Sequence, residues 1–110
     1  MNWISLESHK QLDKLIDKSH SQRVVIFKHS TSCGISRMVL RNFEKDLSST
    51  NPPEVEYYLL DLLAYRSISN QISEVFDVVH QSPQLLIIEK GTAVHHSSHS
   101  NIMASSLELA

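Results

Sequence analysis

The chain has little of several residue types that define whole classes of protein: one cysteine, two glycines and three prolines in 110 residues. A single cysteine cannot form an internal disulfide, which excludes a secreted scaffold held together by disulfides. Ten Lys and Arg against 12 Asp and Glu leave a net charge of −2, so there is no basic excess to bind nucleic acid. No apolar run approaches the roughly 20 residues of a transmembrane helix, and no basic segment begins a signal peptide.

These absences leave the class of ordinary globular domains. Apolar residues make up 41% of the chain, which is close to the composition of such domains. We therefore expect a single domain over residues 1–110, cytoplasmic and monomeric, with no membrane or nucleic-acid partner and one free thiol. Because glycine is so scarce, we expect Gly34 and Gly91 where the backbone needs a residue without a side chain.

The apolar residues predict alternating strands and helices. Runs at residues 23–27 and 85–88 indicate strands that are buried on both faces. A capping box at Ser8 and Gln11 predicts the start of a helix, and Asn51-Pro52-Pro53 predicts a break between elements. Further strands are expected at residues 3–6, 55–63 and 93–95, and further helices from Cys33 to Leu47, from Ser67 to Val79, and from Ser100 or Asn101 through Leu107.

The expected order of elements is β-α-β-α-β-α-β-β-α. The early alternation requires right-handed crossovers between parallel strands, and the tight turn at Lys90-Gly91-Thr92 requires an antiparallel hairpin. An α/β fold with a mixed central sheet of four or five strands, flanked by helices, satisfies both requirements.

The only cysteine falls where a buried strand ends and a helix begins, within Lys28-His29-Ser30-Thr31-Ser32-Cys33. The free N–H groups and the positive end of the helix dipole favour a thiolate there. Lys28 and His29 add positive or donor groups nearby. Thiolates in such places have pKa values of roughly 3.5 to 7.5. We therefore predict that Cys33 is a functional, exposed nucleophile and not a buried structural cysteine.

Cys33-Gly34-Ile35-Ser36 is a Cys-x-x-Cys pattern with serine in the resolving position. Serine cannot expel a mixed disulfide, so the site requires an external thiol to complete each turnover. The hydroxyl of Ser36 can still donate a hydrogen bond to the Cys33 thiolate. Lys28 could orient an anionic carboxylate of the substrate, although a solvated surface lysine is an equally simple interpretation.

Seven histidines raise the possibility of a metal site. On a strand, His95 and His96 face opposite ways, which prevents shared ligation, and no second cysteine is present. We therefore predict no metal site and interpret residues 95–101 as a solvated polar segment. The isolated His9, His20 and His80 are expected on the surface.

The order of elements, the Cys-x-x-Ser motif and Ser82-Pro83 before a strand resemble the thioredoxin fold over the whole chain. Within that fold, the segment from Phe27 to Ser36 is similar to the YtxJ family of small monothiol bacilliredoxin-like proteins. Trp3, the run Tyr57-Tyr58-Leu59-Leu60-Asp61 and Ser82-Pro83-Gln84 also fit that family. One departure is Gly34, because proline often follows the cysteine in the family.

The resemblance implies a thiol–disulfide oxidoreductase of the bacillithiol system, with Cys33 as nucleophile and a cis Pro83 beside it. Ser36 completes the catalytic pair, and Lys28, Gly34, Ile35, Ser82 and Pro83 are expected to contact the substrate. The implied reaction removes bacillithiol, or a similar small thiol, from mixed disulfides on client proteins. The small thiol is a co-substrate, and no tightly bound cofactor is expected.

Two alternative functions stay open at this point. Cys-Gly-Ile-Ser approaches the Cys-Gly-Phe-Ser of monothiol glutaredoxins, some of which hold a [2Fe–2S] cluster with glutathione. The long loop that precedes the motif in those carriers is not evident here. The other alternative is a stress-related binding module in which Cys33 is incidental.

Overall fold

The structure is a computed structural model that describes residues 2–49 and 55–109. The predicted break at Asn51-Pro52-Pro53 lies outside the described residues. The elements, in chain order, are β1 (Trp3–Ser5), α1 (His9–Lys18), β2 (Val24–His29), α2 (Gly34–Ser49), β3 (Glu56–Asp61), α3 (Arg66–Phe76), β4 (Gln84–Glu89), β5 (Thr92–Ser98), the 3₁₀ turn η1 (His99–Asn101) and α4 (Ser106–Leu109).

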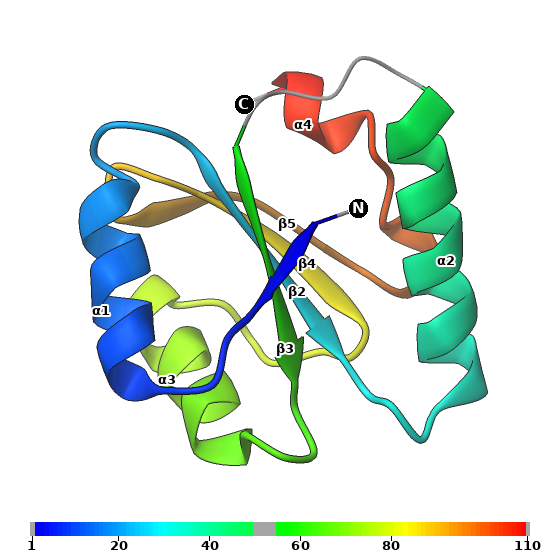
Figure 1. The fold of residues 1–110 in the computed structure, drawn as a ribbon, viewed down its shortest axis with the longest axis horizontal. Helices are drawn as coiled ribbons and strands as arrows, with labels where there is room; N and C mark the ends of the chain where they lie inside the picture. The colour runs from blue at the N-terminus through cyan, green and yellow to red at the C-terminus, as the bar shows by residue number, and fades with distance from the viewer. Residues whose placement is uncertain (1, 50–54, 110) are drawn as a thin grey trace.

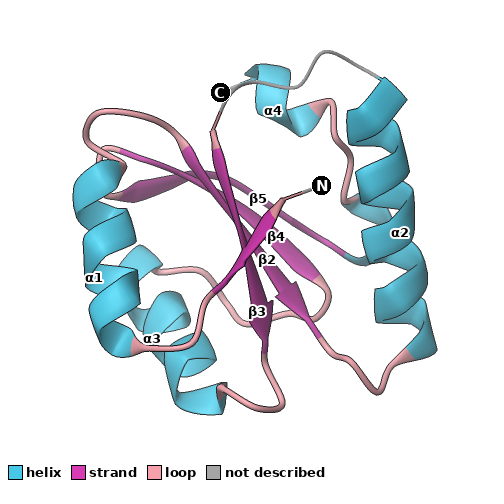
Figure 2. Ribbon diagram, in the orientation of Figure 1, coloured by secondary structure: helices cyan, strands magenta, loops and turns pink. Residues whose placement is uncertain are grey.

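The strands form one mixed sheet in the order β1-β3-β2-β4-β5 (Figure 2). β3 pairs in parallel with both β1 and β2, whereas β4 pairs antiparallel with β2 and β5. The central strand β2 is buried along its whole length. This arrangement confirms the predicted α/β fold with a mixed sheet of four or five strands, and the number is five.

Helices cover both faces of the sheet, with α1 and α3 on one face and α2 and α4 on the other (Figure 1). Successive residues of a strand point to opposite faces, so β2 contributes to two separate cores. Val24 and Ile26 pack in the core beneath α1 and α3, and Val25 and Phe27 pack in the core beneath α2 and α4. We call these the α3 face and the α2 face. Helix α2 lies on its face through residues spaced by four: Val39, Phe43 and Leu47.

Two helix ends show how local chemistry sets the boundaries. The hydroxyl of Ser8 accepts the N–H of Gln11 at 3.1 Å, which confirms Ser8 as the cap of α1. Helix α3 was expected to reach Val79, but it ends at Phe76 because Asp77 adopts a left-handed conformation with φ +52°. Val79 is consequently 80% exposed and lies in the loop that leads to β4.

The β4–β5 hairpin confirms the expectation for one glycine. Its turn residues Lys90 and Gly91 have φ of +52° and +77°, the pattern of a tight hairpin turn in which glycine avoids steric strain. The N–H of Gly91 also donates to the hydroxyl of Ser19 at 2.9 Å.

The C-terminal prediction is wrong in two respects. Strand β5 extends through Ser98, which pairs with Gln84, so it is longer than the expected strand at residues 93–95. Residues 95–101 are nevertheless exposed or half-buried, as expected of a solvated segment. Neither Ser100 nor Asn101 caps a helix, because both lie in η1, and Ile102 after it is extended. The last α-helix spans only Ser106–Leu109. Backbone hydrogen bonds between β5 and β4 make the polar residues 95–98 part of a strand, which their composition alone does not predict.

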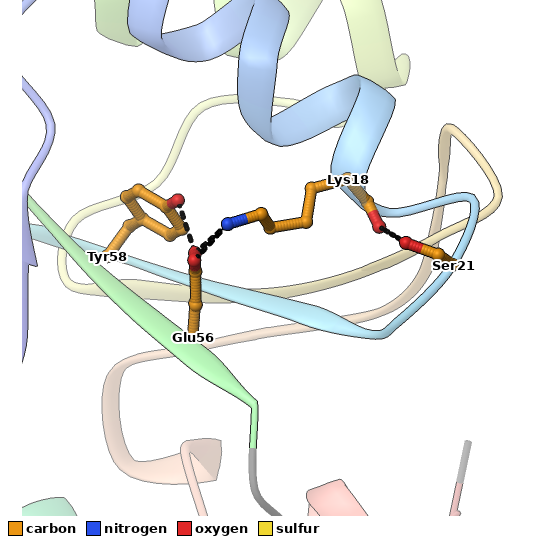
Figure 3. A network of polar contacts seen from close by, with 4 residues as sticks. All are labelled: Lys18, Ser21, Glu56 and Tyr58. Atoms are coloured by element: carbon orange, nitrogen blue, oxygen red, sulfur yellow. Dashed lines mark hydrogen bonds and ion pairs between the residues drawn. The ribbon is translucent and has the colours of Figure 1, made fainter.

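The amino ends of the parallel strands carry a small polar network (Figure 3). Lys18 of α1 donates to the carboxylate of Glu56, with Nζ 3.1 Å from Oε2. The hydroxyl of Tyr58 donates to the same carboxylate at 2.8 Å, and the hydroxyl of Ser21 donates to the Lys18 carbonyl at 3.1 Å. This network fastens α1 to β3 at the end of the sheet opposite to Cys33.

Candidate functional site

Cys33 lies at the N-terminus of α2, as the sequence predicts. Its carbonyl accepts the N–H of Arg37 at 3.1 Å, the first bond of the helix, so Cys33 is the N-cap residue. The side chain is partly exposed. The N–H groups of the first helical turn have no partner earlier in the helix, so the positive end of the helix dipole adjoins the sulfur.

Hydrogen bonds to the backbone carbonyls of His29, Ser30 and Thr31 hold the loop between β2 and Cys33. The N–H of Cys33 donates to the carbonyl of Ser30 at 3.1 Å, which closes a turn. Arg37 donates from Nη1 to the carbonyl of Thr31 at 2.9 Å. The carbonyl of His29 accepts the N–H of Leu62 at 3.0 Å. These hydrogen bonds fix the turn at residues 30–33 that carries Cys33, and we call it the braced turn.

Ser36 occupies the third position of α2 and is completely buried. Its hydroxyl lies 2.8 Å from Nδ1 of His29 and accepts the N–H of Ser30 at 3.1 Å. In the described part of the chain, its hydrogen bonds go to these two residues. The predicted bond from Ser36 to a Cys33 thiolate stays a prediction.

His29 is the last residue of β2, and its ring is buried on the α2 face. Burial lowers the pKa of His29, the carboxylates of Asp61 and Glu44 act in the opposite direction, and Arg37 lowers it further. A lowered pKa keeps the imidazole neutral near pH 7. Sequence reasoning treated His29 only as a nearby donor. Alternate residues of a strand point to the same face, so the position of His29 two residues after Phe27 predicts that its ring faces α2.

Lys28 lies on the opposite face and has no exposed surface. Its ammonium donates to the carbonyl of Ser69 in α3 at 3.0 Å and lies 3.3 Å from Nδ1 of His80. Burial lowers the pKa of Lys28 from 10.5 to about 8. The strand alternation places Lys28 with Ile26, away from the face that carries α2. This position corrects the expectation that Lys28 meets a substrate carboxylate or is a solvated surface residue.

The segment Ser82-Pro83 comes to the same end of the sheet as Cys33. Lys28 pairs with Gln84, so Pro83 lies beside the last residue of β2. The Ser82-Pro83 peptide bond is cis, as the fold resemblance leads us to expect. The carbonyl of Pro83 accepts the N–H of His99 at 3.1 Å, which brings η1 to this end as well.

The surface next to Cys33 is apolar where the helix begins. Ile35 is 61% exposed, and Met38 one turn later is also exposed. Gly34 is helical, and a Cβ there would meet only Nη2 of Arg37 at 3.8 Å. The expectation that the backbone requires glycine at this position is therefore wrong, because the helical backbone accepts a Cβ there without a clash.

The histidines do not gather around a common point. Within residues 2–49 and 55–109, no group of three or more His, Cys, Asp or Glu side chains is placed to hold a metal ion. His95 pairs with Ile87 and His96 pairs with Leu86, so the two rings face opposite ways as expected. His9, His20 and His80 are exposed, as expected, although His9 also bonds Gln71 and Ser67 of α3.

Comparison with known proteins agrees with this geometry. A solved structure described as a proposed oxidoreductase with a thioredoxin fold is 30% identical, with a TM-score of 0.81, and the match covers 96% of this chain and 90% of that one. Thioredoxin from Fasciola hepatica is 23% identical over 96% and 92% of the two chains, with a TM-score of 0.70. Mitochondrial thioredoxin 3 from Saccharomyces cerevisiae is 20% identical over 97% and 91%, with a TM-score of 0.72.

The two thioredoxins support the fold alone, because their identity to this chain is low. The family comparison is more specific: the model of the monothiol bacilliredoxin BrxC family matches residues 4–107. That match includes the braced turn, Cys33, Ser36 and Ser82-Pro83. We conclude that the chain belongs to the monothiol bacilliredoxin BrxC family and has a thiol redox role.

Proposed function

We propose that Cys33 is the nucleophile of a monothiol exchange that removes bacillithiol, or a similar small thiol, from mixed disulfides on client proteins. The observation that carries this proposal is the only cysteine of the chain, partly exposed on a braced turn at the N-terminus of α2. The family supplies the class of reaction, and the identity of the small thiol is part of the proposal.

The exchange proceeds in two balanced steps. The Cys33 thiolate attacks the small-thiol sulfur of the mixed disulfide, a new S–S bond joins Cys33 to the small thiol, and the client leaves as its thiolate. A second small-thiol thiolate then attacks the adduct, which releases a small-thiol disulfide and restores the Cys33 thiolate. The second small thiol is the reductant, because its sulfur is oxidised to the disulfide while the client sulfur is reduced to the thiol; the first small thiol stays at the disulfide oxidation level throughout. The positive end of α2 stabilises the charge on Cys33 as attacking and as leaving sulfur.

Recognition of the client uses the backbone near Cys33 and the exposed apolar surface. Ser82 lies before Gln84, the first paired residue of β4, and its N–H and C=O can pair with an extended client segment. Ile35 offers apolar contact beside the sulfur, and Gly34 leaves room for the client chain. Pro83 shapes this surface without contributing a donor.

The setting we propose is the cytoplasm, where a pool of reduced small thiols can drive the second step. The protein acts as a monomer with no tightly bound cofactor. No helix in the described part of the chain is long and apolar enough to cross a membrane.

Two substitutions at the motif test the mechanism, with a client protein carrying bacillithiol on a known cysteine as substrate. Cys33→Ser should abolish release of the small thiol, because a hydroxyl does not attack a disulfide at neutral pH. Ser36→Cys should supply an internal resolving thiol, so that the adduct on Cys33 no longer accumulates when small thiol is limiting. Mass spectrometry of client and protein measures both results.

Ser32→Ala is the matched control, because Ser32 is an exposed residue of the same turn. It should release the small thiol at the wild-type rate. Release by Cys33→Ser at the wild-type rate would show that the proposed nucleophile is wrong. A wild-type protein that clears glutathione but not bacillithiol from the client would show that the small thiol is not bacillithiol, and would leave the exchange at Cys33 in place.

A further inference from the structure

A buried histidine and a buried serine lie directly behind the turn that presents Cys33. Nδ1 of His29 is 2.8 Å from the hydroxyl oxygen of Ser36, and both side chains are buried. Ser36 is the third residue of α2, and Cys33 is its N-cap. Residues three apart at a helix start are neighbours on its surface, with Cβ atoms about 5–6 Å apart. Ser36 therefore bonds His29 on one side and is a neighbour of Cys33 in the first turn of α2.

The direction of the hydrogen bond between Ser36 and His29 depends on whether Nδ1 of His29 carries a proton. The Ser36 oxygen accepts the N–H of Ser30 at 3.1 Å, which fixes one of its two acceptor positions. If Nδ1 of His29 is unprotonated, the Ser36 hydroxyl donates to it, and the second acceptor position can take the S–H of Cys33. If Nδ1 carries a proton, it donates to Ser36, and the hydroxyl hydrogen can turn to the sulfur. The hydroxyl is satisfied in both arrangements.

We infer that His29 is a positioning residue that takes up the proton of Cys33 through the hydroxyl of Ser36. This inference rests on the proposed role of Cys33 as nucleophile. In this step the Cys33 thiol gives its proton to the Ser36 oxygen while the Ser36 hydroxyl gives its own proton to Nδ1 of His29. The products are a Cys33 thiolate that accepts a hydrogen bond from Ser36 and an imidazolium that donates one to Ser36. The Ser30 bond is kept throughout.

The charges around His29 suit a group that gains a proton temporarily. Asp61 at the end of β3 and Glu44 on α2 favour the imidazolium, whereas Arg37 on α2 and burial oppose it. Lys28 and His80 lie on the other face of the sheet. Because burial lowers the pKa of His29, the ring is neutral before the step and free to accept a proton. The thiolate that forms then compensates the new positive charge.

A purely structural role predicts a different pattern among variants. His29→Asn places an amide near the position of Nδ1, so it can bond Ser36 but cannot take up a proton at neutral pH. We expect His29→Asn and Ser36→Ala to move the pH midpoint of Cys33 alkylation by iodoacetamide upward by about one unit, with a roughly tenfold slower rate below it. His80→Asn is the matched control and should leave the profile unchanged. A wild-type profile for His29→Asn would show that His29 only holds Ser36, and would overturn the inference.

A second measurement does not depend on how the His29 variants fold. The imidazole nitrogens of uniformly ¹⁵N-labelled wild-type protein and of Cys33→Ala are followed by NMR as a function of pH. His29 should titrate at a higher pH in the wild type, because the thiolate stabilises the imidazolium. Identical His29 titrations in the two proteins would also overturn the inference.

Neither measurement involves a client or a small thiol. If the protein fails to release bacillithiol from clients while alkylation and NMR show the coupling, the proposed substrate is wrong and the proton link holds. If release succeeds and the coupling is absent, the proposed function holds and the role of His29 is wrong.

Discussion

Lys28 and His29 are consecutive residues at the end of β2, yet their side chains enter different parts of the molecule. Lys28 points into the α3 face, where its ammonium bonds the Ser69 carbonyl and approaches His80. His29 points into the α2 face, where its ring bonds Ser36 behind Cys33. Burial lowers the pKa of both side chains.

The difference between the two lies in what each side chain can affect. Lys28 ties the strand to α3 and to the loop that leads toward Pro83, so its effect is on the stability of that half. His29 bonds Ser36 in the first turn of the helix that follows Cys33, so under the inference above its effect is on the chemistry of the sulfur. One strand end thus carries a structural cation on one face and a titratable partner of the site on the other.

The largest expected effect compares one phenylalanine on each face. Phe43→Ala on α2 and Phe76→Ala on α3 should each lower the free energy of unfolding by about 3–5 kcal/mol, because both remove a buried ring. Only Phe43→Ala should alter the rate of Cys33 alkylation, since Phe43 packs against Phe27 with ring centroids 5.7 Å apart and holds α2 to the sheet. Urea unfolding followed by circular dichroism measures stability.

Equal changes of the alkylation rate in these two variants would contradict the separation of the faces. The rates must be compared at urea concentrations where both variants are still folded.

The next effect concerns the buried ammonium of Lys28. The folded-state pKa of about 8 lies below the ordinary 10.5, so the unfolded chain binds more protons between these values and wild-type stability rises with pH there. Lys28→Met keeps a chain of similar length without the charge. Its stability relative to wild type should therefore be most favourable at pH 7 and should fall by about 3 kcal/mol between about pH 8 and pH 10.5.

Measuring the difference between the two proteins removes the contribution of other groups that titrate in this range. A constant difference across the range would mean that the fold does not lower the pKa of Lys28, because the amine would then bind its proton equally in the folded and the unfolded chain. The Cys33 alkylation profile should be the same in both proteins, in contrast to the His29 variants.

The smallest effect lies at the opposite end of the sheet, in the network of Figure 3. The hydrogen bond from Lys18 is the main cause that lowers the pKa of Glu56, and the Tyr58 hydroxyl adds to it. Glu56→Gln should cost about 0.5 kcal/mol at pH 7, because the pair is partly exposed. This cost should vanish as pH falls below 4.5 through the lowered pKa, where the wild-type carboxylate also loses its charge. Urea midpoints at pH 7 and pH 3 measure it, and a loss that persists at pH 3 would point to packing instead.

The parts of the fold that follow from local signals were predictable. The β-branched and aromatic residues within 23–27 identified the central strand, and the apolar residues of α2 at every fourth position identified the helix that begins after Cys33. The hairpin followed from Lys90-Gly91. Each of these signals lies within a few residues of the feature that it predicts, and the position of Cys33 at the helix N-terminus follows from two of them together.

The interior of the site depends on contacts between distant residues. Lys28 was read as a surface or substrate-binding residue because lysine is rarely buried, and its partner Ser69 lies 41 residues away in the chain. The sequence predicts a strand at residues 93–95 and a last helix, but not the full length of β5, which pairing with β4 decides, nor the late start of α4. The bond between His29 and Ser36 depends on the turn between Ser30 and Cys33, which no sequence pattern showed.

Trp3 is the only tryptophan of the chain, and the aromatic contacts around it lie on the α2 face. Its ring lies 5.9 Å from that of Phe27 and 6.2 Å from that of Phe43, and its indole N–H donates to Glu44 at 2.8 Å. Excitation at the red edge of the absorption band selects Trp3 over the tyrosines, so the emission reports on the α2 face. Loosening of α2 should quench its emission or shift it to longer wavelengths, while loosening of α1 or α3 alone should leave the spectrum unchanged.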